Sequence, residues 1–390
     1  MYKLLFTFQK EAARLAKDEM KRFGVVPVKM VSDEVCLGET DADMFTFPTP
    51  ALRATPPRRG IGDDPPVFVR HICPVNAILS WDDSAEMIYS RTMSIVGDAH
   101  LGVPNTIGIQ ARTAADISSK PKGVVLDAIH KAVDDSGATR AHGTPDFALS
   151  VLFTADEIMM GISPASLNLS TFAGGNRSFA RTDDMISRSE FKLLEAFEVF
   201  SLTPKGGRAL DLGAAPGGWS RILAGKGYNV VAVDPADLDA RLASNERIEH
   251  KKITAQQYLS GIQNSTIKFD ILANDMKMES SLSARLVSQF AENLKPDGIV
   301  ILTLKLLPGK FLRQIHNARM ILEPRFDIIG IRQLFHNRSE VTVCARPKTG
   351  AVSELHRLLD ESRADVKAGK KRPLQDVMRD IKRGIGDASI

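Results

Sequence analysis

The sequence contains few cysteines and no long apolar segment. Its 390 residues include 3 cysteines, Cys36, Cys73 and Cys344, which lie far apart along the chain. This spacing excludes a disulfide framework and a cysteine-rich zinc site, and it favours a reducing cytoplasm. No apolar run approaches the ~18 residues of a membrane helix, and the apolar stretch after Met1 is too short for a signal peptide. We therefore expect a cytoplasmic protein with no membrane partner and no bound metal.

The overall composition is that of a globular protein. Hydrophobic residues make up 43% of the chain and charged residues 25%, which argues against a disordered or fibrous chain. At ~150 residues per domain, the length predicts two or three domains. The formal net charge of +4 is compatible with a polyanionic partner but does not require one.

The amino-terminal half mixes predicted strands and helices without a catalytic constellation. Residues 2–8 and 25–31 are predicted as strands with a helix at 9–23 between them, which makes a β-α-β start. Further strands are predicted at residues 105–111, 147–153 and 157–162, and a helix at 122–135. Residues 46–66 predict a loop, whose arginines are either solvated or in contact with phosphates; they are Arg53, Arg58 and Arg59. This half is predicted to be a small α+β domain.

The second half contains a glycine-rich turn in a setting that is typical of nucleoside binding. A strand at residues 208–212 runs into Gly213-Ala-Ala-Pro-Gly-Gly-Trp219, and a helix and a second strand ending at Asp234 follow. Glycines let the backbone approach a ligand, the helix presents free N–H groups, and the acid suits ribose hydroxyls. The turn lacks both the G-x-G-x-x-G of dinucleotide sites and the G-K-[ST] of P-loops. The sequence therefore favours a nucleoside without a pyrophosphate.

Alternating strands and helices continue beyond this turn. They predict a mostly parallel, doubly wound sheet, with strands at residues 269–273, 299–304, 326–331 and 340–345. Asp275 and Lys305 follow two of these strands, at the edge where such sheets bind ligands. If the last strand is antiparallel, Glu340 at its start lies at the same edge. Lys192, on the flank of a helix predicted at 188–200, can reach that edge too.

Each of these four residues also has an ordinary interpretation. Lys192 alone would be a surface lysine, Asp275 a helix cap and Glu340 an edge-strand charge. Lys305 interrupts the apolar stretch 299–307, where an unpaired lysine is costly. The set as a whole favours a catalytic site.

The turn and the four residues together resemble a known family. Asp211-Leu-Gly-Ala-Ala-Pro-Gly-Gly-Trp-Ser220 is similar to motif I of the FtsJ-like (RrmJ-type) ribose 2′-O-methyltransferases. The resemblance implies a Rossmann-like class I methyltransferase domain, S-adenosyl-L-methionine as cofactor, and a Lys-Asp-Lys-Glu tetrad. The tetrad would be Lys192, Asp275, Lys305 and Glu340. The cofactor residues would be Gly213, Ala214, Pro216, Gly217, Gly218, Trp219, Asp234 and Asp275.

A closer resemblance is to the RlmM-type cytidine 2′-O-methyltransferases of large-subunit ribosomal RNA. It is carried by the segments 195–200 and 334–343. Such enzymes have a THUMP-containing RNA-binding region, which implies a THUMP-like α+β region here. We expect residues 1–165 to form that region, 166–186 a linker without periodicity, 187–348 the methyltransferase, and 349–390 a helical extension with no counterpart in the family. The acid that family members often place after the third strand is not found at residues 252–255.

We therefore predict methylation of a ribose 2′-hydroxyl in RNA, most simply ribosomal RNA, by a monomer with Lys305 as general base. The alternatives are a non-catalytic RNA-binding module that retains the fold, a tRNA or mRNA-cap methylase, and an enzyme acting on a small molecule. An amino-methylating enzyme would show Asn/Asp-Pro-Pro-aromatic where this chain has Asn274-Asp-Met-Lys277. A cytosine-C5 methylase would need a nucleophilic cysteine, and this half offers Cys344 alone.

Overall fold

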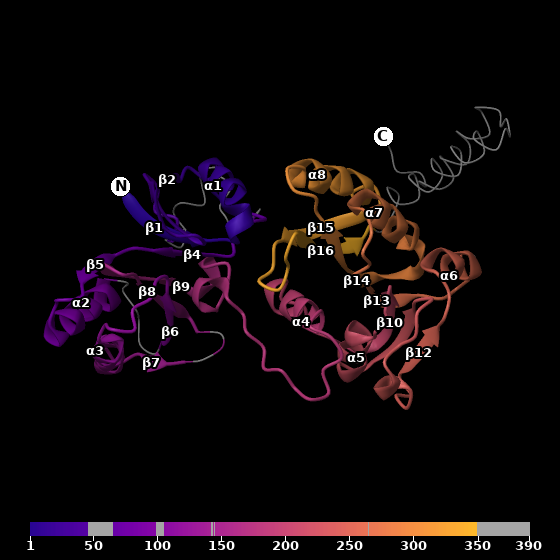
Figure 1. Cartoon of the computed structure of the whole chain (residues 1–390), viewed down its shortest axis with the longest axis horizontal. Coiled ribbons are helices and arrows are strands. Elements are labelled where there is room, and N and C mark those ends of the chain that lie inside the picture. The colour runs from indigo at the N-terminus through magenta and orange to yellow at the C-terminus, as the bar shows by residue number, and fades with distance from the viewer. Residues whose placement is uncertain (46–64, 99–104, 142, 144, 264, 349–390) are drawn as a thin grey trace, which may run out of the picture. The chain divides into compact units, whose positions relative to one another are not determined.

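The chain forms two compact units in a computed structural model. The structure describes residues 1–45, 65–98, 105–141, 143, 145–263 and 265–348. The units are Met1–Phe179 and Ala180–Ile390, and Figure 1 draws their elements. Most of the loop predicted at 46–66, including its three arginines, and the extension predicted at 349–390 lie outside the described residues.

The first unit contains two sheets. The four-stranded sheet has the order β2-β3-β1-β4 and the five-stranded sheet the order β5-β9-β8-β6-β7. Their strands are β1 (Tyr2–Thr7), β2 (Val26–Ser32), β3 (Val35–Thr40), β4 (His71–Pro74), β5 (Ala77–Ser80), β6 (Thr106–Thr113), β7 (Thr139–Arg140), β8 (Phe147–Phe153) and β9 (Glu157–Pro164). The helices are α1 (Ala13–Arg22), α2 (Ala85–Asp98) and α3 (Lys122–Asp135).

The β-α-β start is present with one strand inserted. β3 lies between β1 and β2 and is antiparallel to both, so the two predicted strands are not neighbours. A separate apolar core joins α2 and α3 to the five-stranded sheet, with Ile88, Ile129 and Val151 among its buried side chains. The unit is α+β, as the sequence predicted.

The second unit contains a seven-stranded sheet in the order β12-β11-β10-β13-β14-β16-β15. Its strands are β10 (Gly207–Leu212), β11 (Tyr228–Val233), β12 (Ile248–Lys251), β13 (Phe269–Asn274), β14 (Leu294–Lys305), β15 (Phe326–Arg332) and β16 (Glu340–Pro347). Its helices are α4 (Glu190–Val199), α5 (Gly218–Gly225), α6 (Ala255–Ile262), α7 (Ser280–Gln289) and α8 (Phe311–Leu322). Neighbouring strands from β12 to β14 pair in parallel, whereas β16 is antiparallel to β14 and to β15. This confirms the predicted fold class and the antiparallel last strand.

The central strands of this sheet, β10, β13 and the second half of β14, are apolar because helices cover both faces of the sheet. α4 and α5 pack on one face, where Phe197 and Leu223 meet Ile271 and Ile301 in a single buried cluster. Figure 1 shows α7 and α8 on the opposite side of the sheet. The carboxyl ends of β10, β13 and β14 therefore form one common edge, and the start of the antiparallel β16 returns to it.

Candidate active site

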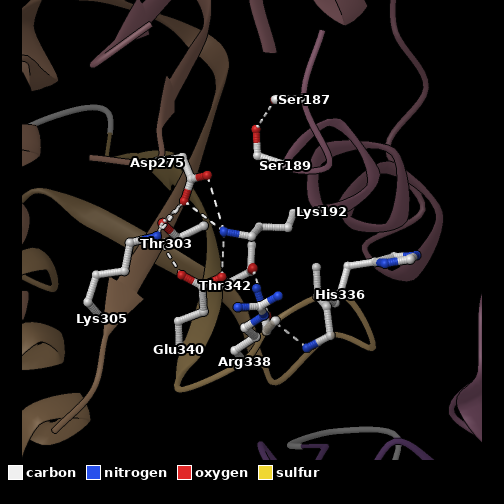
Figure 2. A network of polar contacts seen from close by, with 12 residues as sticks. Ser187, Ser189, Lys192, Asp275, Thr303, Lys305, His336, Arg338, Glu340 and Thr342 are labelled. Carbon is white, nitrogen blue, oxygen red and sulfur yellow. Dashed lines mark hydrogen bonds and ion pairs between the residues drawn. The ribbon is translucent and has the colours of Figure 1, made fainter. Parts of the chain in front are cut away.

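Four charged side chains meet at this edge of the sheet. Lys192 comes from α4, Asp275 follows β13, Lys305 ends β14 and Glu340 begins β16. Lys305 and Glu340 are direct partners in the antiparallel ladder between β14 and β16. Figure 2 shows the four side chains pointing toward one another. The structure thus brings together the residues that the sequence proposed as a tetrad.

Each carboxylate of the tetrad bridges both lysines. Lys192 Nζ lies 3.2 Å from Asp275 Oδ2 and 2.5 Å from Glu340 Oε1. Lys305 Nζ lies 2.5 Å from Asp275 Oδ1 and 2.5 Å from Glu340 Oε2. The exposed fractions of the side chains run from 8% for Glu340 to 26% for Lys305. Because the charges are partly buried, removing one of them would leave its partners with an uncompensated charge, which is costly.

The electrostatic surroundings keep Lys192 positively charged. Burial disfavours its ammonium form, but the carboxylates of Asp275 and Glu340 outweigh burial and raise the pKa of Lys192. Lys192 is therefore suited to hold a developing negative charge.

The glycine-rich turn lies at the neighbouring strand end, between β10 and α5. Gly213 and Gly217 have φ of 72° and 107°, which L side chains rarely adopt. A Cβ on Gly213 would lie 2.3 Å from Met276 Cγ, directly after Asp275, so the turn packs closely against the tetrad segment. Ala214 is buried and Pro216 is exposed.

Asp234 holds the turn from the end of β11. Its Oδ2 accepts a hydrogen bond from Ala215 N at 3.1 Å, and its Oδ1 accepts one from Ala236 N at 2.8 Å. Each carboxylate oxygen can accept a further bond, so the side chain can still bind hydroxyl groups.

The sequence relationships agree with this geometry. Residues 185–308 match the model of the FtsJ-like methyltransferase family. These residues form an FtsJ-like methyltransferase domain. A protein named ribosomal RNA large subunit methyltransferase M from Methylococcus capsulatus is 34% identical over 170 residues, which span 40% of this chain but only 46% of that protein. Its namesake from Thauera aminoaromatica is 27% identical over 71% of this chain and 78% of its own length.

TrmN from Thermus thermophilus aligns with 89% of this chain and 100% of that chain, at 14% identity and a TM-score of 0.35.

FtsJ-like methyltransferases depend on S-adenosylmethionine, and the residues at the turn fit this cofactor. The close backbone approach at Gly213 and Gly217, the start of α5 and the carboxylate of Asp234 offer the donors and acceptors that an adenosine and an amino acid need. Residues 252–255 contain no acid. Thr254 in this segment instead caps the start of α6, where it forms a capping box with Gln257.

Two buried side chains beside the glycine-rich turn of the methyltransferase make hydrogen bonds that fix the neighbouring elements. Trp219 is 3% exposed and donates its indole N–H to the carbonyl of Ser189 at 2.8 Å, which ties α5 to the start of α4. Asp211 accepts the hydroxyl of Ser220 at 2.7 Å. Burial, reinforced by the charge of Asp275, raises the pKa of Asp211 to about 7.

Glu195 is a site residue whose role the sequence did not reveal. It lies one turn after Lys192 on α4, and its carboxylate accepts hydrogen bonds from Phe335 N at 2.7 Å and His336 N at 3.0 Å. These two residues belong to the loop that leads into Glu340. A carboxylate among the apolar positions of the buried face of α4 was the available signal. The two segments that carry the RlmM-type resemblance thus touch each other.

Other chemistries find less support in the methyltransferase. Cys344 is fully buried in β16, and burial raises the pKa of its thiol to about 12, which makes it a poor nucleophile. Within the described ranges, no cluster of His, Cys, Asp or Glu is arranged to hold a metal ion. None of the described helices combines the length and the apolar character that crossing a bilayer requires.

Proposed function

We propose that this chain methylates a ribose 2′-hydroxyl in RNA and that its substrate is large-subunit ribosomal RNA, with a cytidine as the target. The observation that carries the reaction type is the tetrad, in which both carboxylates bridge both lysines beside the glycine-rich turn. The printed names of the relatives carry the choice of ribosomal RNA.

The cofactor is assigned to the turn and to the two acids that flank it. The backbone from Gly213 to Gly218 would hold the amino acid and the adenosine, with Trp219 behind it, and Asp234 would bind the ribose hydroxyls. Asp275 stands between this turn and the lysines. When bound, S-adenosylmethionine supplies a methyl group on a positively charged sulfur, and this charge favours the neutral form of a nearby lysine.

Lys305 is the general base in this proposal. Because Lys192 is held in its charged form, its role is to stabilise the oxygen of the ribose as that oxygen gains negative charge. Lys305 Nζ takes the proton of the 2′-hydroxyl as that oxygen gains the methyl group that the bound cofactor would supply. Asp275 and Glu340 orient both lysines, since each carboxylate contacts both.

The test uses RNA from cells that lack this modification, labelled S-adenosylmethionine and nucleoside analysis of the product. The wild-type protein is expected to yield a labelled 2′-O-methyl nucleoside, and Lys305→Ala to yield none while binding the cofactor normally. Lys268→Ala is the matched control, because Lys268 is exposed just before β13, at the other end of that strand from Asp275. It is expected to retain full activity.

Four outcomes would contradict the proposal. Label on a base would overturn the assignment of the tetrad. Cofactor binding by the wild-type protein without transfer to any RNA would favour a binding module, and label on tRNA or on capped mRNA alone would change the substrate. If Lys305→Ala lost cofactor binding together with activity, Lys305 would have a structural role instead.

A further inference from the structure

One buried hydroxyl joins the base to the acid of the tetrad. Thr303 lies in β14 two residues before Lys305, so both side chains project from the same face of the strand. Its exposed fraction is 0%, and neither RNA nor cofactor can contact it. Figure 2 shows its side chain beside Lys305 and Asp275.

The hydrogen bonds of Lys305 leave no donor unused. A lysine ammonium carries three N–H groups. Those of Lys305 meet Asp275 Oδ1 at 2.5 Å, Glu340 Oε2 at 2.5 Å and Thr303 Oγ1 at 2.8 Å. The hydroxyl of Thr303 in turn donates its own proton to Asp275 Oδ1 at 2.6 Å. Thr303, Lys305 and Asp275 therefore form a closed triangle of contacts.

This triangle accounts for a polar atom in an otherwise apolar stretch of β14. From Ile299 to Leu304, Thr303 is the one residue of β14 that is not aliphatic, and a valine would pack there equally well. A fully buried hydroxyl is costly unless it is hydrogen-bonded, so its contacts with Lys305 and Asp275 explain its presence.

We propose that Thr303 is a positioning residue for methyl transfer. Its hydroxyl holds Lys305 Nζ and the carboxylate of Asp275 in one arrangement, so that Lys305 reaches the ribose from a defined place. The inference rests on the proposed function.

The test compares Thr303→Val, which keeps the shape but removes the hydroxyl, with Thr303→Ser, which keeps the hydroxyl. We expect the valine variant to lower kcat for RNA methylation about tenfold or more, with an unchanged dissociation constant for S-adenosylmethionine and an unchanged KM for RNA. The serine variant is expected to recover most of kcat. A merely structural role would not separate kcat from binding in this way.

Thr92→Val is the matched control. Thr92 is also 0% exposed, but its hydroxyl donates to the carbonyl of Ile88 in the first unit, so its loss should leave kcat unchanged. If Thr303→Val does not fold, Thr303→Ala replaces it in the comparison with serine. Wild-type kcat in the valine or alanine variant would overturn the inference, as would a serine variant as impaired as valine. If the wild-type protein itself transfers no methyl group, the proposed function fails and the inference falls with it.

Discussion

Replacing Glu195 with alanine tests how the tetrad is held in place. Glu195 is 3% exposed, and its two oxygens accept the N–H groups of Phe335 and His336 at 2.7 and 3.0 Å. The substitution removes both acceptors and leaves the two backbone donors to find other partners. The loop from β15 to β16 would then lose its anchor on α4.

The expected loss of stability follows from these two bonds. A hydrogen bond to a charged group contributes ~1.5–3 kcal/mol, so two contribute roughly twice that. Relief from burying the carboxylate offsets part of the sum, which leaves about 3 kcal/mol. For a domain of ~150–250 residues, each 1 kcal/mol shifts Tm by ~2–4 °C. Glu195→Ala should therefore lower the Tm of the second unit by about 6–12 °C.

Activity should fall further than cofactor affinity, because the loop leads into Glu340 and not into the glycine-rich turn. Calorimetry would measure the transition, and methyl transfer and cofactor binding would be measured below it. Glu198→Ala is the control, since Glu198 lies on the same helix but is exposed. A Tm for Glu195→Ala that equals the Tm of this control would refute the reasoning.

Two further predictions concern buried groups. Burial lowers the pKa of His71 to about 4, although the hydrogen bond between its ring and the accepting Oε1 of Gln110 acts in the opposite direction. As pH falls from about 6.5 to 4, the unfolded chain therefore binds a proton that the folded chain does not, and the first unit loses up to about 3 kcal/mol of stability. Urea unfolding at pH 7 and pH 5 should show a smaller loss in His71→Gln, and equal losses would count against this. Burial raises the pKa of Cys73 and Cys344 to about 12, so both thiols should resist alkylation at pH 8 until denaturant is added. Mass spectrometry would detect modification, and rapid labelling of the native protein would contradict the prediction.

The sequence predicted elements best where apolar runs are bounded by clear stop signals. The helix at 122–135 and the strand at 147–153 have the predicted bounds. α2 and α7 were not predicted. In α7 the serines Ser280 and Ser283 are among the buried residues, so its buried face is not marked by apolar residues alone. β12 was also missed, since its residues Ile248–Lys251 are mostly polar and half-buried at the edge of the sheet.

The site was predictable where position along a strand decides it. The ends of β13 and β14 and the start of β16 place Asp275, Lys305 and Glu340 at one edge of the sheet. The order Lys-Asp-Lys-Glu along the chain then indicated the tetrad. Thr303 and Glu195 could not be found this way, because their contacts join elements far apart in the chain. A threonine in a strand and a glutamate in a helix are common, and only the packed structure distinguishes these two.

The position of β16 has a consequence for the timing of assembly. β16 lies between β14 and β15 in the sheet, yet both of those strands precede it in the chain. During synthesis, β14 and β15 can therefore form their final pairing only after β16, which pairs with both, has been synthesised. Glu340 is the first residue of that neighbour, so a chain released before it carries the complete glycine-rich turn but an open tetrad. The tetrad is thus complete only in a polypeptide whose β16 has been synthesised and inserted into the sheet.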